Sequence, residues 1–321
     1  MQSTYACLFT CLTALLVAPA AEAAFPALES DVNFNTGVGT LVLQFVSGQY
    51  NTAFGDQALN ANTSGASNTA LGAQALLSNS TGTGNTAVGD RALNLNSSGT
   101  ENTATGAGAL FGNTTGTENS AYGWSALVAN DTGLSNTAIG YQSMASNISG
   151  SYNTGGGSYT LFANTTGIQN TSMGWGALSA NTTGSNNTSL GDQSMFLSTI
   201  GARNTAIGRN ALGKNVTGSG NIALGADAGS RLTTGSFNID IGHIGVARET
   251  KTIRIGTQGK QLKTYVAGVR GATISGGAVV MVSKTGQLGM QTSSRRYKED
   301  IQAMGDASAA LLRLKPVTFR Y

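Results

Sequence analysis

Few side chains in this sequence could carry out chemistry. His243 is the only histidine among 321 residues, so catalytic triads and zinc sites built on histidine have little material. Both cysteines, Cys7 and Cys11, lie in an apolar N-terminal segment, and removal of that segment would leave no thiol. We therefore expect a mature protein with no cofactor, no metal site and no disulfide.

Other familiar motifs are also weak. Asp56, Asp90 and Asp192 are unpaired and stand at a variable position, which does not indicate calcium loops. The glycine-rich strings recur periodically and lack the strand-then-helix context of a phosphate loop. Glycosylation sequons such as those at Asn113 and Asn181 are better interpreted as side-chain ladders and turns, since Asn and Thr satisfy backbone groups at corners.

The element that must position any functional side chain is a 17-residue repeat. Twelve copies of N-T-A-x-G-x-x-A-L-x-x-N-T-T-G-x-x run from Asn51 to Gly242 without an insertion. We number the positions of each copy from 1 to 17, starting at its first Asn. A period this regular predicts a solenoid, in which each coil stacks only on its neighbours. The predicted fold class is mainly β, a parallel β-roll or solenoid, followed by a small α+β C-terminal segment.

Residues that stay the same from one copy of the repeat to the next indicate what the stack of coils requires. Gly at positions 5 and 15 predicts corners with a positive φ or a close backbone approach. Position 9 carries Leu or Met in the first ten copies, each contributing about 2 kcal/mol if fully buried. Position 12 is Asn from Asn62 to Asn181, and stacked Asn side chains can hydrogen-bond from coil to coil. The A-L-x-x-N half fits either a second strand or a single helical turn.

The strand itself predicts assembly. Position 3 is small and position 4 is mostly larger and apolar, and adjacent strand residues point to opposite faces. Both faces therefore look buried, although one thin coil has only one interior. A continuous apolar stripe of this length is unusual on a soluble monomer. We expect the position-4 face to pack against identical copies of the chain.

The N-terminal segments predict export and capping. Residues 1–23 resemble a signal peptide, with an apolar run over residues 12–18 and small residues at the cleavage site. This run is too short for a transmembrane anchor, so we expect a secreted or cell-surface protein without an integral membrane anchor. Residues 24–50 would cap the first coil, because residues 41–46 are more apolar than the repeats.

The period ends after the twelfth repeat. Residues 243–292 contain short β segments with Gly-rich turns and form a predicted β-rich neck. In residues 293–321, Asp306 would cap a short helix over residues 307–313. The net charge of +3 is small and there is no basic face with stacking aromatics, so no nucleic-acid partner is expected.

The N-T-A-x-G repeats resemble the left-handed β-roll heads of trimeric autotransporter adhesins and related phage-type tail fibres. The resemblance covers roughly residues 35–242. It implies a homotrimer in which three chains pack their coils around a common axis. It also implies a structural fibre or adhesin-like protein with a cell-surface or glycan receptor.

Residues 293–321 resemble the start of the intramolecular chaperone domain of endosialidase-type tail spikes, incomplete at its C-terminal side. The resemblance rests on S-S-R-R-Y-K from Ser293 to Lys298, the following D-I, and L-L-R-L-K-P-V-T-F-R-Y at the end. It implies a self-cleaving dyad with Ser293 as nucleophile, Lys298 as base and Thr292–Ser293 as the scissile bond. A Ser hydroxyl needs such a base, and Lys can serve when burial lowers its pKa.

Three classes of function remain open from the sequence. The first is a structural or adhesive fibre whose C-terminal segment assists trimer assembly. The second is an enzyme limited to autoproteolysis by Ser293 and Lys298. The third is an ice- or surface-binding solenoid, motivated by the Thr column at position 2. That column is interrupted at Ser120, Ile222 and Ile239, and a paired T-x-T face is missing.

Overall fold

The computed structural model describes residues 31–269, 275–290 and 318. The predicted signal peptide, the first residues of the predicted cap and the predicted helix over 307–313 lie outside these ranges. The chain divides into two compact units, one ending at Thr257 and the other beginning at Gln258.

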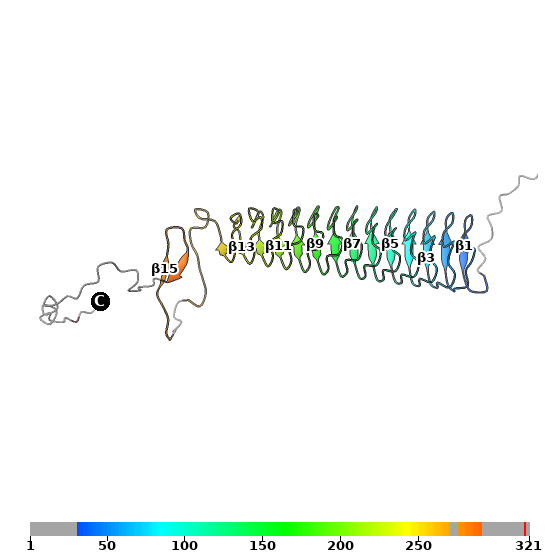
Figure 1. Cartoon of the computed structure of the whole chain (residues 1–321), viewed down its shortest axis with the longest axis horizontal. Coiled ribbons are helices and arrows are strands. Elements are labelled where there is room, and N and C mark those ends of the chain that lie inside the picture. The colour runs from blue at the N-terminus through cyan, green and yellow to red at the C-terminus, as the bar shows by residue number, and fades with distance from the viewer. Residues whose placement is uncertain (1–30, 270–274, 291–317, 319–321) are drawn as a thin grey trace, which may run out of the picture. The chain divides into compact units, whose positions relative to one another are not determined.

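The first unit is built on one fourteen-stranded parallel sheet in which the strands follow one another in chain order (Figure 1). Each strand is three residues long, as expected from the short T-A-x segment of the repeat. The strands are β1 Thr36–Val38, β2 Thr52–Phe54, β3 Thr69–Leu71, β4 Thr86–Val88, β5 Thr103–Thr105, β6 Ser120–Tyr122, β7 Thr137–Ile139, β8 Thr154–Gly156, β9 Thr171–Met173, β10 Thr188–Leu190, β11 Thr205–Ile207, β12 Ile222–Leu224, β13 Ile239–Ile241 and β14 Ile253–Ile255.

The register confirms the parallel solenoid with a 17-residue period. Each strand position pairs with the same position of the next coil, for example Ala53 with Ala70 between β2 and β3. The sheet extends one strand beyond the predicted repeats at each end. Thr36 of β1 pairs with Thr52, and Ile253 of β14 pairs with Ile239 of β13. Part of the predicted cap and the first residues of the predicted neck therefore belong to the solenoid.

The A-L-x-x-N half of each coil is neither a strand nor a helical turn. Positions 6–11 form an irregular turn in which positions 7 and 9 repeatedly adopt left-handed φ values, such as 56° at Gln57 and 50° at Leu59. A left-handed residue that is not Gly costs about 1 kcal/mol or more. Burial of the position-9 side chain, at about 2 kcal/mol, offsets that cost. We call positions 2–4 the strand half and positions 6–11 the turn half.

The core of the solenoid lies between the strand half and the turn half. Position 3 of the strand half faces inward, as do positions 8 and 9 of the turn half, and Ala53, Ala58 and Leu59 are fully buried. The buried position-9 residues confirm the predicted ladder. They are Leu59, Leu76, Leu93, Leu110, Leu127, Met144, Leu161, Leu178, Met195 and Leu212.

Two asparagine ladders run along the coils. At position 12, Asn79 Nδ2 donates to Asn62 Oδ1 (2.8 Å) and to the carbonyl of Gly82 (3.0 Å). At position 1, Asn68 Nδ2 donates to Asn51 Oδ1 (3.1 Å) and to the same Gly82 carbonyl (2.8 Å). The predicted position-12 ladder is confirmed. Asn113 and Asn181 of the two sequons belong to it and are fully buried.

The two glycine corners have different causes. Gly55 at position 5 has a φ of +134°, and a Cβ there would meet the backbone of Gly72 in the next coil. Gly65 at position 15 is not left-handed. A Cβ there would instead collide with Asn62 Oδ1 and the carbonyl of Gly82. Positive φ therefore explains position 5 only, whereas close approach explains both positions.

The second unit contains an antiparallel hairpin of β15 (Val280–Val282) and β16 (Leu288–Met290). Ser283 N donates to the carbonyl of Gln287 at its turn (2.9 Å). Every described residue in 258–290 is exposed. No α-helix occurs in the described ranges, so none there is long and apolar enough to cross a membrane.

Candidate functional site

The outer face of the sheet carries two parallel columns. Strands alternate so that position 3 is buried while positions 2 and 4 point outward, as in β7, where Ala138 is buried and Ile139 is 51% exposed. Within one chain, then, only one face of the strand is covered. We call the outward apolar residues the position-4 column: Phe54, Leu71, Val88, Tyr122, Ile139, Met173, Leu190, Ile207, Leu224 and Ile241.

This face has the chemistry of a packing surface. Leu71, Met173 and Leu224 are each about half exposed, and their side chains have no polar atom to bind or activate a small substrate. The neighbouring position-2 column is mainly Thr. Only one repeat has Thr at both outward positions, Thr103 and Thr105 of β5. A face of paired Thr residues is therefore missing, as expected from the sequence. The face therefore suits contact with another flat apolar surface.

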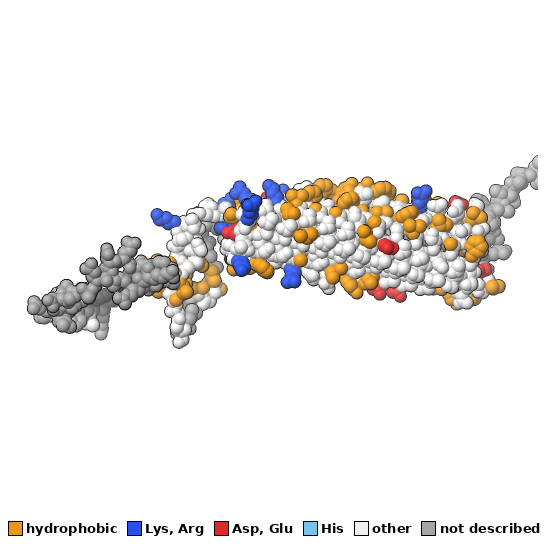
Figure 2. All heavy atoms as spheres, in the orientation of Figure 1, with side chains coloured by type: hydrophobic (Ala, Val, Ile, Leu, Met, Phe, Trp, Pro, Cys, Tyr) orange, Lys and Arg blue, Asp and Glu red, His pale blue; other side chains and the backbone are white. Residues whose placement is uncertain are grey.

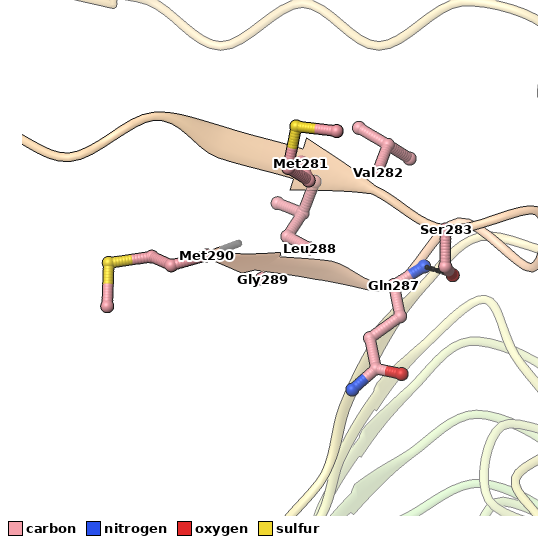
Figure 3. A pocket seen from close by; sticks show the side chains of 7 residues that line it. All are labelled: Met281, Val282, Ser283, Gln287, Leu288, Gly289 and Met290. Atoms are coloured by element: carbon pink, nitrogen blue, oxygen red, sulfur yellow. Dashed lines mark hydrogen bonds between the residues drawn. The ribbon is translucent and has the colours of Figure 1, made fainter. Parts of the chain in front are cut away.

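The hairpin of the second unit is a second uncovered apolar surface (Figure 3). Val280, Val282, Leu288 and Met290 are 58%, 65%, 69% and 65% exposed. A lone two-stranded hairpin is marginally stable in water. Met281 and Leu288 line a shallow apolar pocket at this hairpin, which offers no titratable group. Neither surface is covered by described residues of its own unit.

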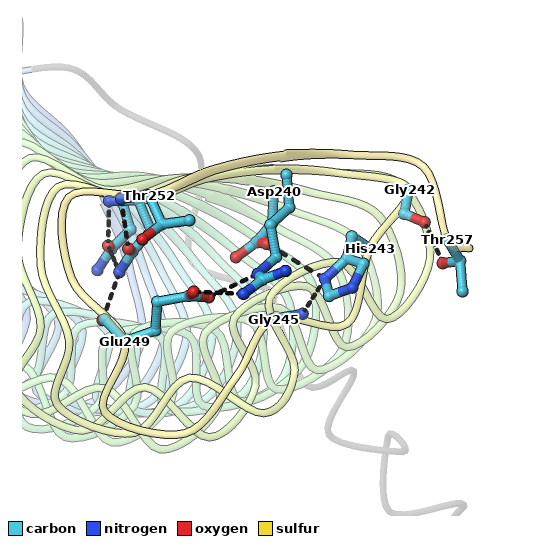
Figure 4. A network of polar contacts seen from close by, with 10 residues as sticks. Asp240, Gly242, His243, Gly245, Glu249, Thr252 and Thr257 are labelled. Atoms are coloured by element: carbon cyan, nitrogen blue, oxygen red, sulfur yellow. Dashed lines mark hydrogen bonds and ion pairs between the residues drawn. The ribbon is translucent and has the colours of Figure 1, made fainter. Parts of the chain in front are cut away.

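The last coils hold the one buried carboxylate of the described residues (Figure 4). Asp240 of β13 occupies position 3, where other coils carry a small residue, and is 1% exposed. Its Oδ1 lies 3.6 Å from His243 Nδ1, which accepts a hydrogen bond from the Gly245 amide (2.9 Å). Burial raises the pKa of Asp240, while the nearby His243 opposes that rise.

An ion pair closes the same end of the solenoid. Arg254 of β14 donates to both carboxylate oxygens of Glu249, at 2.7 and 2.5 Å. The hydrogen bond from Arg254 is the main reason why the pKa of Glu249 is lowered. The Glu249 carbonyl accepts from Asn238 Nδ2 (2.8 Å), which joins the pair to the position-1 ladder. The network thus has a structural role, and no group of three potential metal ligands occurs in the described ranges.

The predicted catalytic residues Ser293 and Lys298 and the Thr292–Ser293 bond lie outside the described residues. His243, the only histidine of the sequence, lies beside Asp240. The sequence reasoning missed Asp240, although an Asp in a column of small residues is a recognisable signal. It also did not single out the aromatic side chains at positions 6, 7 and 10 of the turn half, because their rings become neighbours only when the coils stack.

Comparison with known proteins identifies no relative. No model of a known protein family matches the sequence, and a search of curated proteins gives no match. The resemblances to adhesin heads and to the tail-spike chaperone therefore rest on the quoted residues alone.

Proposed function

We propose that this protein is the structural rod of a homotrimeric fibre, secreted or exposed at a cell surface, with an adhesin-like role. The observation that supports it best is the amount of apolar surface that one chain leaves uncovered. This surface comprises the position-4 column of the solenoid and the hairpin β15–β16. Neither surface carries groups suited to catalysis, and both can be covered by identical copies.

The energetics are of the right size for assembly. A half-exposed Leu or Ile side chain gains about 1 kcal/mol when the rest of it is covered. The seven members of the position-4 column that are 36–51% exposed would then gain about 7 kcal/mol per chain, against an association cost of about 4–15 kcal/mol. The hairpin adds further apolar area. Assembly through the column and the hairpin together is therefore favourable.

Sequence features supply the number of chains and the route to assembly. Three copies follow from the resemblance to trimeric adhesin heads, and residues 293–321 would act as the chaperone segment that aligns them. Thirteen steps between fourteen strands, at about 4.8 Å each, make a solenoid about 60 Å long. Such a rod can hold a receptor-binding surface away from its attachment point.

The test is the mass of the full chain in solution, by light scattering and sedimentation. We expect the wild type to have the mass of three chains, and Ile139→Asp to dissociate it because a charge would be buried at the interface. Thr81→Asp, at an exposed polar position, is the matched control and should remain trimeric. A wild-type monomer with native circular dichroism would contradict the proposal.

A further inference from the structure

The middle of the solenoid carries an aromatic cluster on its turn half. The Trp124 and Tyr141 rings stack with centroids 5.0 Å apart and an interplanar angle of 13°. Tyr159 meets Tyr141 edge to face at 5.3 Å, and Phe162 meets Tyr159 at 5.7 Å. On the following coils, Trp175 stacks with Phe196 at 6.4 Å. We call these rings the aromatic cluster: Trp124, Tyr141, Tyr159, Phe162, Trp175 and Phe196.

The cluster is open to solvent. Trp124, Tyr141 and Trp175 are 49%, 43% and 48% exposed, and both tryptophans of the chain belong to it. These three residues share position 6, just after the glycine corner, so they lie on the turn half and outside the position-4 column. Figure 2 shows hydrophobic side chains gathered along the upper edge of the solenoid over its middle coils. Exposed Trp and Tyr are typical of binding surfaces rather than of bare protein surface.

The coils that carry the cluster, residues 119–203, contain only three charged residues, Asp131, Asp192 and Arg203, and Asp192 shares position 6 with Trp175 on the next coil. Residues 132–191 contain no Asp, Glu, Lys, Arg or His, so the coils from Asn136 to Asn186 are neutral throughout. Their exposed polar residues are Ser, Thr, Asn and Gln, such as Ser149, Thr154 and Gln169, and the half-buried Gln142 and Ser158 respectively follow Tyr141 and precede Tyr159 in the chain. A polyanion such as nucleic acid or an acidic polysaccharide would find no cation here. The neutral amides and hydroxyls instead suit a ligand rich in hydroxyl groups.

We infer that the aromatic cluster binds a neutral glycan, an uncharged chain of hexoses. In the stacked pairs one face of each ring is covered by its partner, so the apolar C–H groups of a sugar would contact the outer faces and the edges of the rings. The sugar hydroxyls would pair with neighbouring amides and hydroxyls. Because the rings recur on successive coils, the cluster forms a row along the solenoid axis, parallel to an extended sugar chain. Several weak contacts then add along one chain. This inference deepens the proposed adhesive role by giving it a ligand class.

The two tryptophans allow a direct experiment on the full chain. Their fluorescence is followed during titration with uncharged oligosaccharides of glucose, mannose and galactose, and calorimetry gives the affinity. We expect a saturable change with at least one series, and a loss of about tenfold or more in affinity for Tyr141→Ala and Trp175→Ala. Tyr141→Phe keeps the ring and should bind better than Tyr141→Ala. An oligosaccharide of sialic acid should not compete.

The matched control is Tyr50→Ala, which removes an exposed, stacked ring outside the cluster and should leave binding unchanged. If no neutral series changes the fluorescence, the inference is wrong. It is also wrong if the cluster variants alter the mass of the assembly, because the rings would then be contacts between copies. Glycan binding by a protein that proves monomeric would support this inference while removing the trimer.

Discussion

In most coils, two asparagine side chains meet at one carbonyl oxygen, that of the Gly at position 15. This arrangement restricts three positions of the repeat. Asn at positions 1 and 12 is buried, and position 15 has no room for a Cβ. The N-terminal end of the position-1 ladder, at Asn35, also has hydrogen-bond partners. Asn35 donates from its backbone and side chain to the carboxylate of Asp31 (2.9 and 3.0 Å), which lowers the pKa of Asp31.

The position-12 ladder is broken once inside the solenoid, and repairing it should stabilise the protein. Ser198 replaces Asn, and Ser198 Oγ, Asn181 Oδ1 and Asn215 Oδ1 are buried without a hydrogen-bond partner among the described residues. Ser198→Asn would supply a donor to Asn181 Oδ1 and an acceptor for Asn215 Nδ2, whereas Asn215 Oδ1 stays without a donor because the next coil has Leu232 at position 12. We expect a gain of about 2 kcal/mol in the free energy of unfolding, measured by urea denaturation.

The control for this repair is Ser64→Asn, which places the same side chain at an exposed position. It should change the free energy of unfolding by less than about 0.5 kcal/mol. Equal stabilities of the Ser198→Asn variant and the wild type would mean that the ladder contributes no net stability.

The proposed Ser293–Lys298 dyad predicts self-cleavage at one bond. The full chain should convert to two fragments that separate between Thr292 and Ser293, because the Lys298 amine would remove the proton of the attacking hydroxyl. Intact mass spectrometry gives the fragment masses. Ser293→Ala should stay whole, with Ser294→Ala as the matched control that still cleaves. A wild-type chain that remains uncut under all assembly conditions would refute this activity.

At the scale of elements, one coil is a three-residue strand and an irregular turn, and neither is stable alone. Each needs the coil on either side to supply hydrogen bonds and core contacts. In the last coils β14 follows β13 after a shorter loop than in the other coils. The Asp240–His243 and Glu249–Arg254 contacts lie at that end. Stability at this end should therefore depend on pH more than it does in the neutral coils.

Asp240 gives this pH dependence a definite sign. Because burial raises its folded-state pKa, its stability contribution is complete below the unfolded value of about 3.9 and is lost as pH rises through the folded value. Asp240→Ala, which restores a residue usual at position 3, should stabilise β13 and β14 increasingly as pH rises above the unfolded value and through the raised folded-state pKa of Asp240. Hydrogen exchange of their amides measures the effect.

Two controls separate this effect from others. Asp192→Ala removes an exposed carboxylate and should leave the pH profile unchanged. Glu249 acts in the opposite direction, since its pKa is lowered, but it is present in both proteins and cancels in the comparison. If Asp240→Ala lowers protection equally at every pH, the carboxylate has a packing role instead.

At the scale of the whole molecule, the solenoid is close to one-dimensional, so its stability should be a sum over coils. Deletion of residues 102–118 removes one complete coil and joins position 17 to position 1. We expect a folded protein with a slightly smaller urea m-value, because less surface is exposed on unfolding. Circular dichroism and urea unfolding provide the measurement.

Deletion of residues 102–110 is the matched control for register. It joins position 17 to position 10, which removes a strand half and shifts every later column by about half a coil. We expect loss of β-sheet signal or of cooperative unfolding. Equal behaviour of the two deletions would show that the register of the columns is not what holds the coils together.

The sequence by itself determined the period, the parallel solenoid, the inward Leu ladder and the Asn ladder. Equivalent positions of successive coils have the same surroundings, so the same residue type recurs there every 17 residues. The sequence left the conformation of the turn half open, since left-handed φ values at residues such as Leu59 contradict local preference and are stabilised only by burial against the next coil. It also hid the aromatic cluster. Trp124 and Tyr141 are 17 residues apart, and only the stacking of coils brings their rings to 5.0 Å.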